Sequence, residues 1–205
     1  TSGPSGPAGF SYAMDAHRGS APMLSQRTAG RCRLVVASLF LLVLAGCASR
    51  PLPLNYAPSS VLTAEGKVDV TAFQYLPAQG GKIKPNQVRN TAMGDVVFEK
   101  NVDMIMRDAV FSEMRLVGIK MDKGGNALSG RIEEFLIDDL GYSVDWTLRV
   151  RYIVTDPQGQ VVYDQVKNVE RNTSKFANVF GALNETIKLN IEQTIQDPAF
   201  ITAIN

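Results

Sequence analysis

Residues 142–155 carry an apolar side chain at every second position from Tyr142 to Val154, and this pattern limits the fold more than any other feature of the chain. A period of two places successive side chains on opposite faces of a β-strand. One apolar and one polar face are typical of an antiparallel sheet that is buried on one side. Asp156-Pro157-Gln158-Gly159 then predicts a hairpin turn, with the return strand over 161–172. The buried face is expected to carry Tyr142, Val144, Trp146, Leu148, Val150, Tyr152 and Val154.

Two amphipathic helices are predicted on either side of these strands. In the first, over Asp95–Val117, apolar residues recur at helical spacing, with Asp95 as the expected N-cap and Gly118 as the stop. The second helix covers 180–196, and Asp197-Pro198 then begins a short terminal helix. The first helix contains three methionines, which are expected either to belong to the hydrophobic core or to line an adaptable binding groove. They are Met104, Met106 and Met114.

Three shorter strands complete the predicted order. They are expected over 119–122, over 127–138 and over 67–73, where Val68, Val70 and Ala72 alternate with Asp69, Thr71 and Phe73. A long loop is expected over 74–94. The order strand, helix, four strands, helix predicts one α+β domain over 67–205, an antiparallel sheet backed by two amphipathic helices.

The first third of the chain has the features of a secretory signal. Residues 34–45 read LVVASLFLLVLA, and a helix of this length spans only about 18 Å of a hydrocarbon core of roughly 30 Å. Arginines precede this run without an intervening acid, which is typical of a signal peptide over 23–46. Residues 1–22 are rich in Gly, Pro and Ser, and we expect them to be a disordered extension upstream of the natural start at Met23.

The end of the apolar run resembles the bacterial lipobox. The four residues are Leu44, Ala45, Gly46 and Cys47. In a lipobox the cysteine sulfur receives a diacylglyceryl group and the chain is cut before the cysteine, which would make Cys47 the lipid attachment point. Several acyl chains on one residue anchor a protein stably, whereas a single chain does not. Because aspartate does not follow Cys47, the resemblance implies the periplasmic face of the outer membrane, with 47–66 as a flexible tether containing several prolines.

Cleavage before Cys47 changes the composition that bears on function. The 205 residues fall to 159, and the net charge falls from +1 to about −2, which disfavours nucleic-acid binding. Cys32 and His17 both lie before the cleavage point, so the remaining chain lacks histidine and any second cysteine. Catalysis by histidine or a free thiol and histidine-ligated metals are therefore excluded there, and we expect no enzyme activity, no cofactor and no metal.

Two surfaces remain as candidates for binding a partner. One is basic and lies in the long loop, and the other is aromatic and precedes the second helix. Glu133/Glu134 and Asp138/Asp139 offer carboxylate pairs for glycan hydrolysis, but neighbours in a strand point to opposite faces. The partner-binding candidates are Lys82, Lys84 and Arg89, followed by Phe176 and Phe180.

The whole pattern resembles the YajG-type bacterial lipoproteins. The resemblance includes the lipobox, the helix over 95–117, the hairpin VDWTLRVRYIVTDPQGQVVYDQ and the helix after FGALNET. It implies an envelope location and an α+β fold, but no reaction. The first hypothesis is a membrane-anchored lipoprotein with a non-enzymatic domain that binds an envelope protein or a lipid or peptidoglycan component. The alternatives are an accessory lipoprotein of an envelope lipid transporter or of peptidoglycan synthesis, or a carboxylate-based glycan hydrolase.

Overall fold

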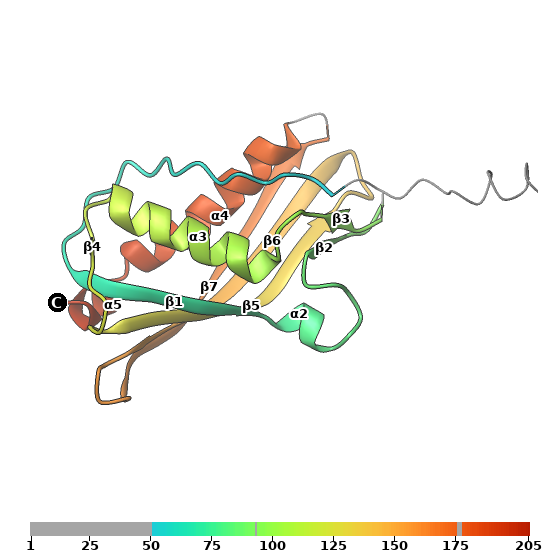
Figure 1. Cartoon of the computed structure of the whole chain (residues 1–205). Helices are drawn as coiled ribbons and strands as arrows, with labels where there is room; N and C mark the ends of the chain where they lie inside the picture. The colour runs from blue at the N-terminus through green and yellow to red at the C-terminus, as the bar shows by residue number, and fades with distance from the viewer. Residues whose placement is uncertain (1–50, 93, 176–177) are drawn as a thin grey trace, which may run out of the picture. The chain divides into compact units, whose positions relative to one another are not determined.

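An α+β domain is formed by residues 51–205, of which the computed structural model describes all except 93, 176 and 177. Helices cover one face of a seven-stranded sheet, so the predicted fold class is confirmed (Figure 1). In chain order the elements are β1 (Lys67–Tyr75), α2 (Leu76–Gln79), β2 (Gln87–Asn90), β3 (Val96–Val97), α3 (Val102–Leu116), β4 (Lys120–Met121), β5 (Ala127–Asp138), β6 (Ser143–Thr155), β7 (Val161–Ser174), α4 (Val179–Ile195) and α5 (Pro198–Ala203).

Strands β5, β6 and β7 form the antiparallel part of the sheet. Each pairs with the next along almost its whole length. The turn between β6 and β7 is the predicted hairpin, because the Asp156 carboxylate accepts from the N–H groups of Gln158 and Gln160. Gly159 closes this turn at φ 85°, in the left-handed region that favours glycine. The alternating pattern and the turn residues therefore predicted these two strands and the hairpin between them correctly.

The other edge of β5 departs from the prediction of an antiparallel sheet. β1 pairs with the first half of β5 and β2 with its end, and both run parallel to it. The connection from β1 to β5 passes through helix α3. A strand that returns through a helical crossover runs in the same direction as the first strand. The sheet is therefore mixed: among the strands that the sequence predicted, the antiparallel pairing is found for β5, β6 and β7, and the short β2 and β3 also pair antiparallel.

A bulge in β1 changes which of its side chains are buried. The register shifts between Val70 and Phe73, so both side chains face the core and Ala72 is exposed. The simple alternation expected for this strand is therefore wrong from Ala72 onward. The Phe73 ring lies against Gly130 of β5, where an added Cβ would be 2.1 Å from a ring carbon. Gly130 is thus the residue that makes room for this ring.

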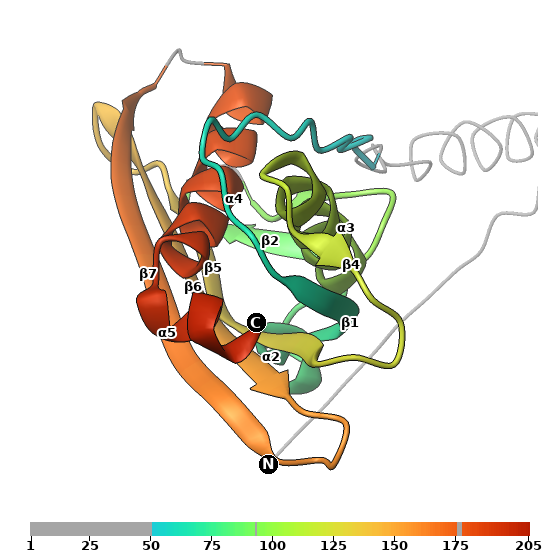
Figure 2. The same cartoon turned by 90° about the vertical axis from the view of Figure 1, so that its left-hand side faces the viewer.

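Helices α3 and α4 lie side by side over the same face of the sheet (Figure 2). The N-cap of α3 is Asn101 and not Asp95, because residues 96–98 are used by β3 and by a bridge from Phe98 to Leu52. Gly118 follows the helix at φ 107°, as expected of a stop. Asp197 caps α5 through the N–H of Ala199, which confirms the predicted terminal helix.

The core between helices and sheet contains the predicted apolar face of β6 with one exception. Tyr142 precedes the strand and is fully exposed, because β6 begins only at Ser143. Asn190 of α4 is the central polar contact: its side chain accepts from the Tyr152 hydroxyl and donates to the carbonyls of Leu148 and Lys167. The confirmed buried residues of β6 are Val144, Trp146, Leu148, Val150, Tyr152 and Val154.

The segment predicted as one long loop, 74–94, contains secondary structure. β1 continues to Tyr75, the short helix α2 follows, and β2 joins β5. Neither period is visible in the sequence because α2 and β2 have only four residues each. The remaining loop leads from the strand that pairs with the first half of β5, which is β1, to the strand that pairs with its end, which is β2.

Residues 51–66 are held by the domain, which corrects the prediction of a flexible tether over this part of 47–66. Leu52 bonds to Val97, and Ala64 bonds to the carbonyl of Val117 at the end of α3. Between them, the segment crosses both helices and buries Leu54 and Ser60. The prolines exclude a regular strand here, but they do not prevent packing and side-chain hydrogen bonding.

Candidate functional site

The outer edge of β1 is open for most of its length. β4 pairs only with Lys67 and Val68. From Asp69 to Tyr75, no other strand of the described chain lies beside that edge. A strand edge of this kind presents backbone N–H and C=O groups to a further strand. The open edge is therefore the first candidate site.

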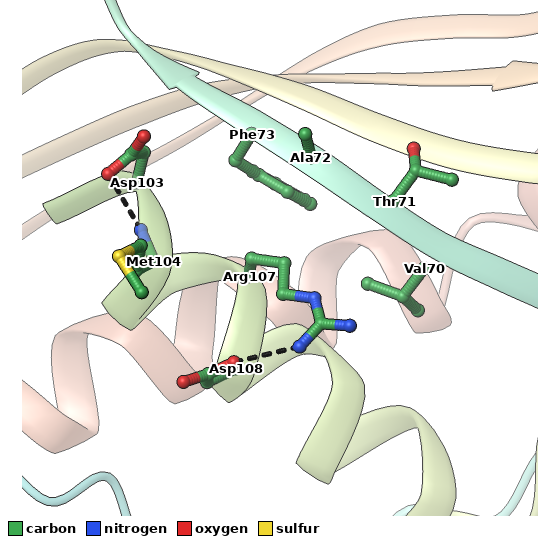
Figure 3. Close-up of a pocket in the computed structure, with 8 residues that line it drawn as sticks. All are labelled: Val70, Thr71, Ala72, Phe73, Asp103, Met104, Arg107 and Asp108. Atoms are coloured by element: carbon green, nitrogen blue, oxygen red, sulfur yellow. Dashed lines mark hydrogen bonds and ion pairs between the residues drawn. The ribbon is translucent and has the colours of Figure 1, made fainter. Parts of the chain in front are cut away.

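A groove lies between this edge and the first turns of α3 (Figure 3). It has a volume of about 350 Å³. Val70 and Phe73 supply its apolar floor, and the more exposed Met104 stands on the helix opposite. We call this hollow the β1-edge groove, and its lining residues are Val70, Thr71, Ala72, Phe73, Asp103, Met104, Arg107 and Asp108.

The groove continues toward the end of β1. A second hollow of about 290 Å³ shares Phe73 and Asp103 with the first and reaches Tyr75, Pro85 and Asn101. Burial raises the pKa of the Tyr75 phenol above its usual range, with Asp95 acting in the same sense and Arg89 opposing it. The phenol is thus a neutral donor, and no partner for its hydroxyl lies within the described residues. The two hollows together follow β1 from Val70 to Tyr75.

The charged side chains that line the groove, Asp103, Arg107 and Asp108, all lie on α3. Arg107 bonds to the Asp108 carboxylate at 3.0 Å and also lies over the Phe111 ring, with its guanidinium carbon 5.4 Å from the ring centroid. Asp103 accepts from the N–H of Met104 in the first turn. An apolar floor between a free strand edge and a charged rim suits an extended peptide, which bonds through its main chain and places alternate side chains in the groove.

A separate pocket, away from the two hollows along β1, lies where the edge of β5 changes its pairing partner from β1 to β2. It has a volume of about 300 Å³. This pocket brings together Lys82 and Arg89, two of the predicted basic residues, with Arg149 of β6. A bulge in β5 lets both Glu133 and Glu134 reach Arg149, at 3.2 and 3.3 Å.

These carboxylates are poorly suited to the hydrolase hypothesis. The expectation that Glu133 and Glu134 point to opposite faces is wrong at this bulge. Both nevertheless pair with one guanidinium, whereas a glycosidase places its two carboxylates on opposite sides of the scissile glycosidic bond. Asp138 accepts from the Thr91 hydroxyl, and Asp139 pairs with Lys175 at 3.1 Å. Each of the four carboxylates thus has a structural partner.

The other predicted site residues are dispersed. Lys84 is exposed in the loop before β2 and lines neither pocket, while Phe180 is exposed in the first turn of α4. Phe176 lies outside the described residues, as do Cys47 and the lipobox residues Leu44, Ala45 and Gly46.

Sequence reasoning missed the β1-edge groove itself. The only hint of it in the sequence was the set Met104, Met106 and Met114, for which an adaptable groove was one of two interpretations. Met106 and Met114 are buried in the core, whereas Met104 stands at the groove. The free edge of β1 depends on strand pairing between distant residues and has no local signature.

Among the described residues, a hollow between the helices and the sheet has a volume of about 10 Å³ and is lined by core residues such as Phe98 and Leu148. A space of this size holds about one water molecule and no acyl chain. The prediction made by the lipid-carrier alternative, an apolar pocket between helices and sheet, is therefore not met.

The described part of the chain shows neither a membrane-spanning helix nor a cluster of metal-binding side chains. No helix between residues 51 and 205 has the length and apolar character needed to cross a bilayer. No group of three or more His, Cys, Asp or Glu side chains in the same part has an arrangement that holds a metal ion.

Comparison with known proteins gives structural likeness only. No family model and no curated protein matches the sequence. A hypothetical protein from Chlamydia trachomatis is 10% identical over 64% of this chain and 91% of its own, with a TM-score of 0.42. A minor lipoprotein from Acinetobacter baumannii is 12% identical over 55% and 89%, with a TM-score of 0.35. A lipoprotein from Neisseria meningitidis is 8% identical over 63% and 99%, with a TM-score of 0.27. These values assign neither a family nor a function, and the YajG-type resemblance stays a prediction.

Proposed function

We propose that this chain is a lipid-anchored protein of a bacterial envelope, attached through Cys47, whose domain acts without catalysis by binding an extended segment of a partner protein. The attachment is supported by the sequence, in which a signal-like apolar run ends at the lipobox residues Leu44 to Cys47. The outer membrane is the favoured location because Ala48 and Ser49, and no aspartate, follow the cysteine.

The observation that carries the binding role is the β1-edge groove. A free strand edge beside an apolar hollow supports strand addition, in which the main chain of the ligand supplies affinity and its side chains supply specificity. The hollow of about 350 Å³ has room for side chains of such a segment. The small volume of the core-lined hollow, about 10 Å³, supports this surface role over carriage of a lipid within the domain.

Site-specific crosslinking tests the binding role in intact envelopes. A photoreactive amino acid at Ala72, which is exposed on the free edge, is expected to capture a discrete partner. The matched control is the same amino acid at Gln158, which is exposed in the β6–β7 turn. With the photoreactive amino acid moved to Thr71, the substitution Ala72→Arg is expected to abolish capture of the partner. The substitution Gln158→Arg in the same labelled protein is the control and is expected to leave capture unchanged. Equal products from Ala72 and Gln158, or none from Ala72, contradict the proposal.

A further inference from the structure

The exposed apolar residues at one end of the domain lie where the chain enters it from the anchor. Tyr142 is fully exposed and Leu140 is 71% exposed in the turn between β5 and β6. Val179 and Phe180 stand exposed on the first turn of α4, and Leu52 lies at the start of the described chain. We call Leu140, Tyr142, Val179 and Phe180 together the entry-end patch.

Printed contacts connect these segments to one end of the sheet. Thr91 after β2 bonds to Asp138 before the β5–β6 turn. Lys175 after β7 donates to the carbonyls of Asp139 and Gly141 in that turn. Both views place the start of α4 and the β5–β6 turn at the end opposite the chain's C-terminus (Figures 1 and 2).

The chain enters the domain from this same end. Leu52 forms a parallel bridge with Phe98, just after β3. β3 runs antiparallel to β2, so the first residue of β3 lies near the last residue of β2. The turn that follows β2 contains Thr91, which bonds to Asp138. A chain parallel to β3 therefore arrives at Leu52 from the side of the entry-end patch.

The length of chain between the lipid and the domain is short. Only residues 48–50 separate Cys47 from Pro51. Four Cα–Cα steps span at most about 14 Å when fully extended. Residues 51–66 add no reach, because Leu52, Ser60 and Ala64 are bonded to the domain. The attachment proposed above therefore leaves the entry end within a short distance of the bilayer.

We propose that the entry-end patch rests on the lipid bilayer, so that the domain stands on the membrane by one end of its sheet. This inference depends on the proposed attachment at Cys47 and adds an orientation to it. Tyrosine suits the level of the lipid headgroups, where its ring is buried and its hydroxyl is hydrated, and leucine and phenylalanine gain from burial below it. Of the nearby acids, Asp139 pairs with the cationic Lys175, and Asp138 accepts a hydrogen bond from the Thr91 hydroxyl.

The orientation also places the β1-edge groove away from the lipid. The twelve-residue strand β5 spans about 40 Å, and β1 pairs with its first half, the half remote from the entry end. The first residues of the groove, Val70 and Thr71, lie beside that remote half. A partner segment can then reach the groove from the compartment while the anchor stays in the membrane.

Depth-dependent quenching in the full, lipid-attached chain tests this orientation. Cys47 is the only cysteine after residue 46, so Leu140→Cys and Gln158→Cys each add one free thiol for an environment-sensitive fluorophore. The labelled proteins are reconstituted in vesicles of phosphatidylethanolamine and phosphatidylglycerol that contain a headgroup spin-labelled lipid. The probe at 140 is expected to be quenched several-fold more than the probe at 158, and Phe180→Cys and Lys123→Cys provide a second matched pair.

Two results overturn the proposal, and they differ from failure of the attachment. Equal quenching at 140 and 158, or at 180 and 123, means that the domain has no preferred end toward lipid. A blue shift at 140 without lipid quenching means that protein, and not the bilayer, covers the patch. The mass of the N-terminal peptide from the same sample reports acylation of Cys47 independently: an unmodified Cys47 refutes the attachment and this orientation with it.

Discussion

The hydroxyl of Tyr56 donates a hydrogen bond to the carboxylate of Glu113, which is fully buried on α3. The same carboxylate accepts from the N–H groups of Ser59 and Ser60. Burial, followed by the bond to Glu113, raises the pKa of the Tyr56 phenol above its usual range, so it remains a donor. One side chain of the helix thus fixes the segment that leads to the proposed lipid anchor.

Glu113→Gln is expected to loosen this segment. An amide cannot accept from all three donors and turns an N–H group toward them, which costs roughly 2–3 kcal/mol for a buried charged acceptor. Limited proteolysis is expected to cut within 51–66 before the rest of the domain unfolds. Glu192→Gln serves as the control, because the Glu192 side chain accepts from the Ser60 hydroxyl, a single bond that an amide oxygen can still accept. Equal protease resistance of both variants and the parent chain would show that Glu113 does not hold the segment.

Gly130→Ala is expected to disturb the β1-edge groove from beneath. The new methyl group would lie 2.1 Å from the Phe73 ring, which also packs edge-on against Tyr152. Displacing a buried ring costs about 1–3 kcal/mol and removes part of the groove floor. A lower thermal midpoint with weaker crosslinking from Ala72 is the predicted result. Gly80→Ala is the matched control, since the nearest atom to its new methyl group is 3.9 Å away; an equal effect of the two changes would contradict this role for Gly130.

Asn190→Ala is expected to destabilise the domain by about 3 kcal/mol, because it leaves the Tyr152 hydroxyl and two carbonyls without their buried partner. Tyr152→Phe removes one bond of the same network and is expected to cost only about 1 kcal/mol. Denaturant unfolding measures both values. Equal losses in the two variants would show that Asn190 contributes only through Tyr152.

The carboxylate of Asp197 gives stability with a defined pH dependence. It accepts from Lys167 at 2.6 Å and from Tyr163 at 2.9 Å, and these bonds, Lys167 first, hold its pKa below the ordinary value. A group whose pKa falls on folding stabilises the protein above its unfolded pKa, and this stabilisation is lost as the pH falls through the folded pKa. Asp197→Asn is therefore expected to cost about 1–2 kcal/mol at neutral pH and progressively less below pH 3.8.

Thermal unfolding of both proteins between pH 7 and pH 2 measures this dependence. The comparison variant is Asp164→Asn. Arg151 also lowers the pKa of Asp164, but that pair is well exposed, so a smaller effect is expected. A difference between parent and Asp197→Asn that stays constant with pH would contradict the charge-dependent contribution of Asp197.

Local patterns predicted the elements whose determinants are close in the chain. The alternation around Trp146 predicted β6, the Asp156 turn predicted the β6–β7 hairpin, and Asp197 with Pro198 predicted the start of α5. In each case the side chain, its partner or its face is fixed within a few residues. These are the parts of the fold for which sequence reasoning was sufficient.

The remaining features depend on contacts between distant residues. The parallel pairing of β1 follows from the crossover through α3, and the packing of 51–66 follows from Glu113, 57 positions beyond Tyr56. The β1-edge groove exists because β4 pairs with only the first two residues of β1. The bulge at Glu133 likewise brings two carboxylates to Arg149, against the alternation expected of a strand.

The most direct test of the proposed attachment is the mass of the N-terminal peptide of the protein isolated from its own membranes. The expected chain begins at Cys47, with residues 1–46 removed and a diacylglyceryl group on the sulfur. A chain that retains residues 23–46, or one that begins elsewhere with an unmodified Cys47, would contradict it.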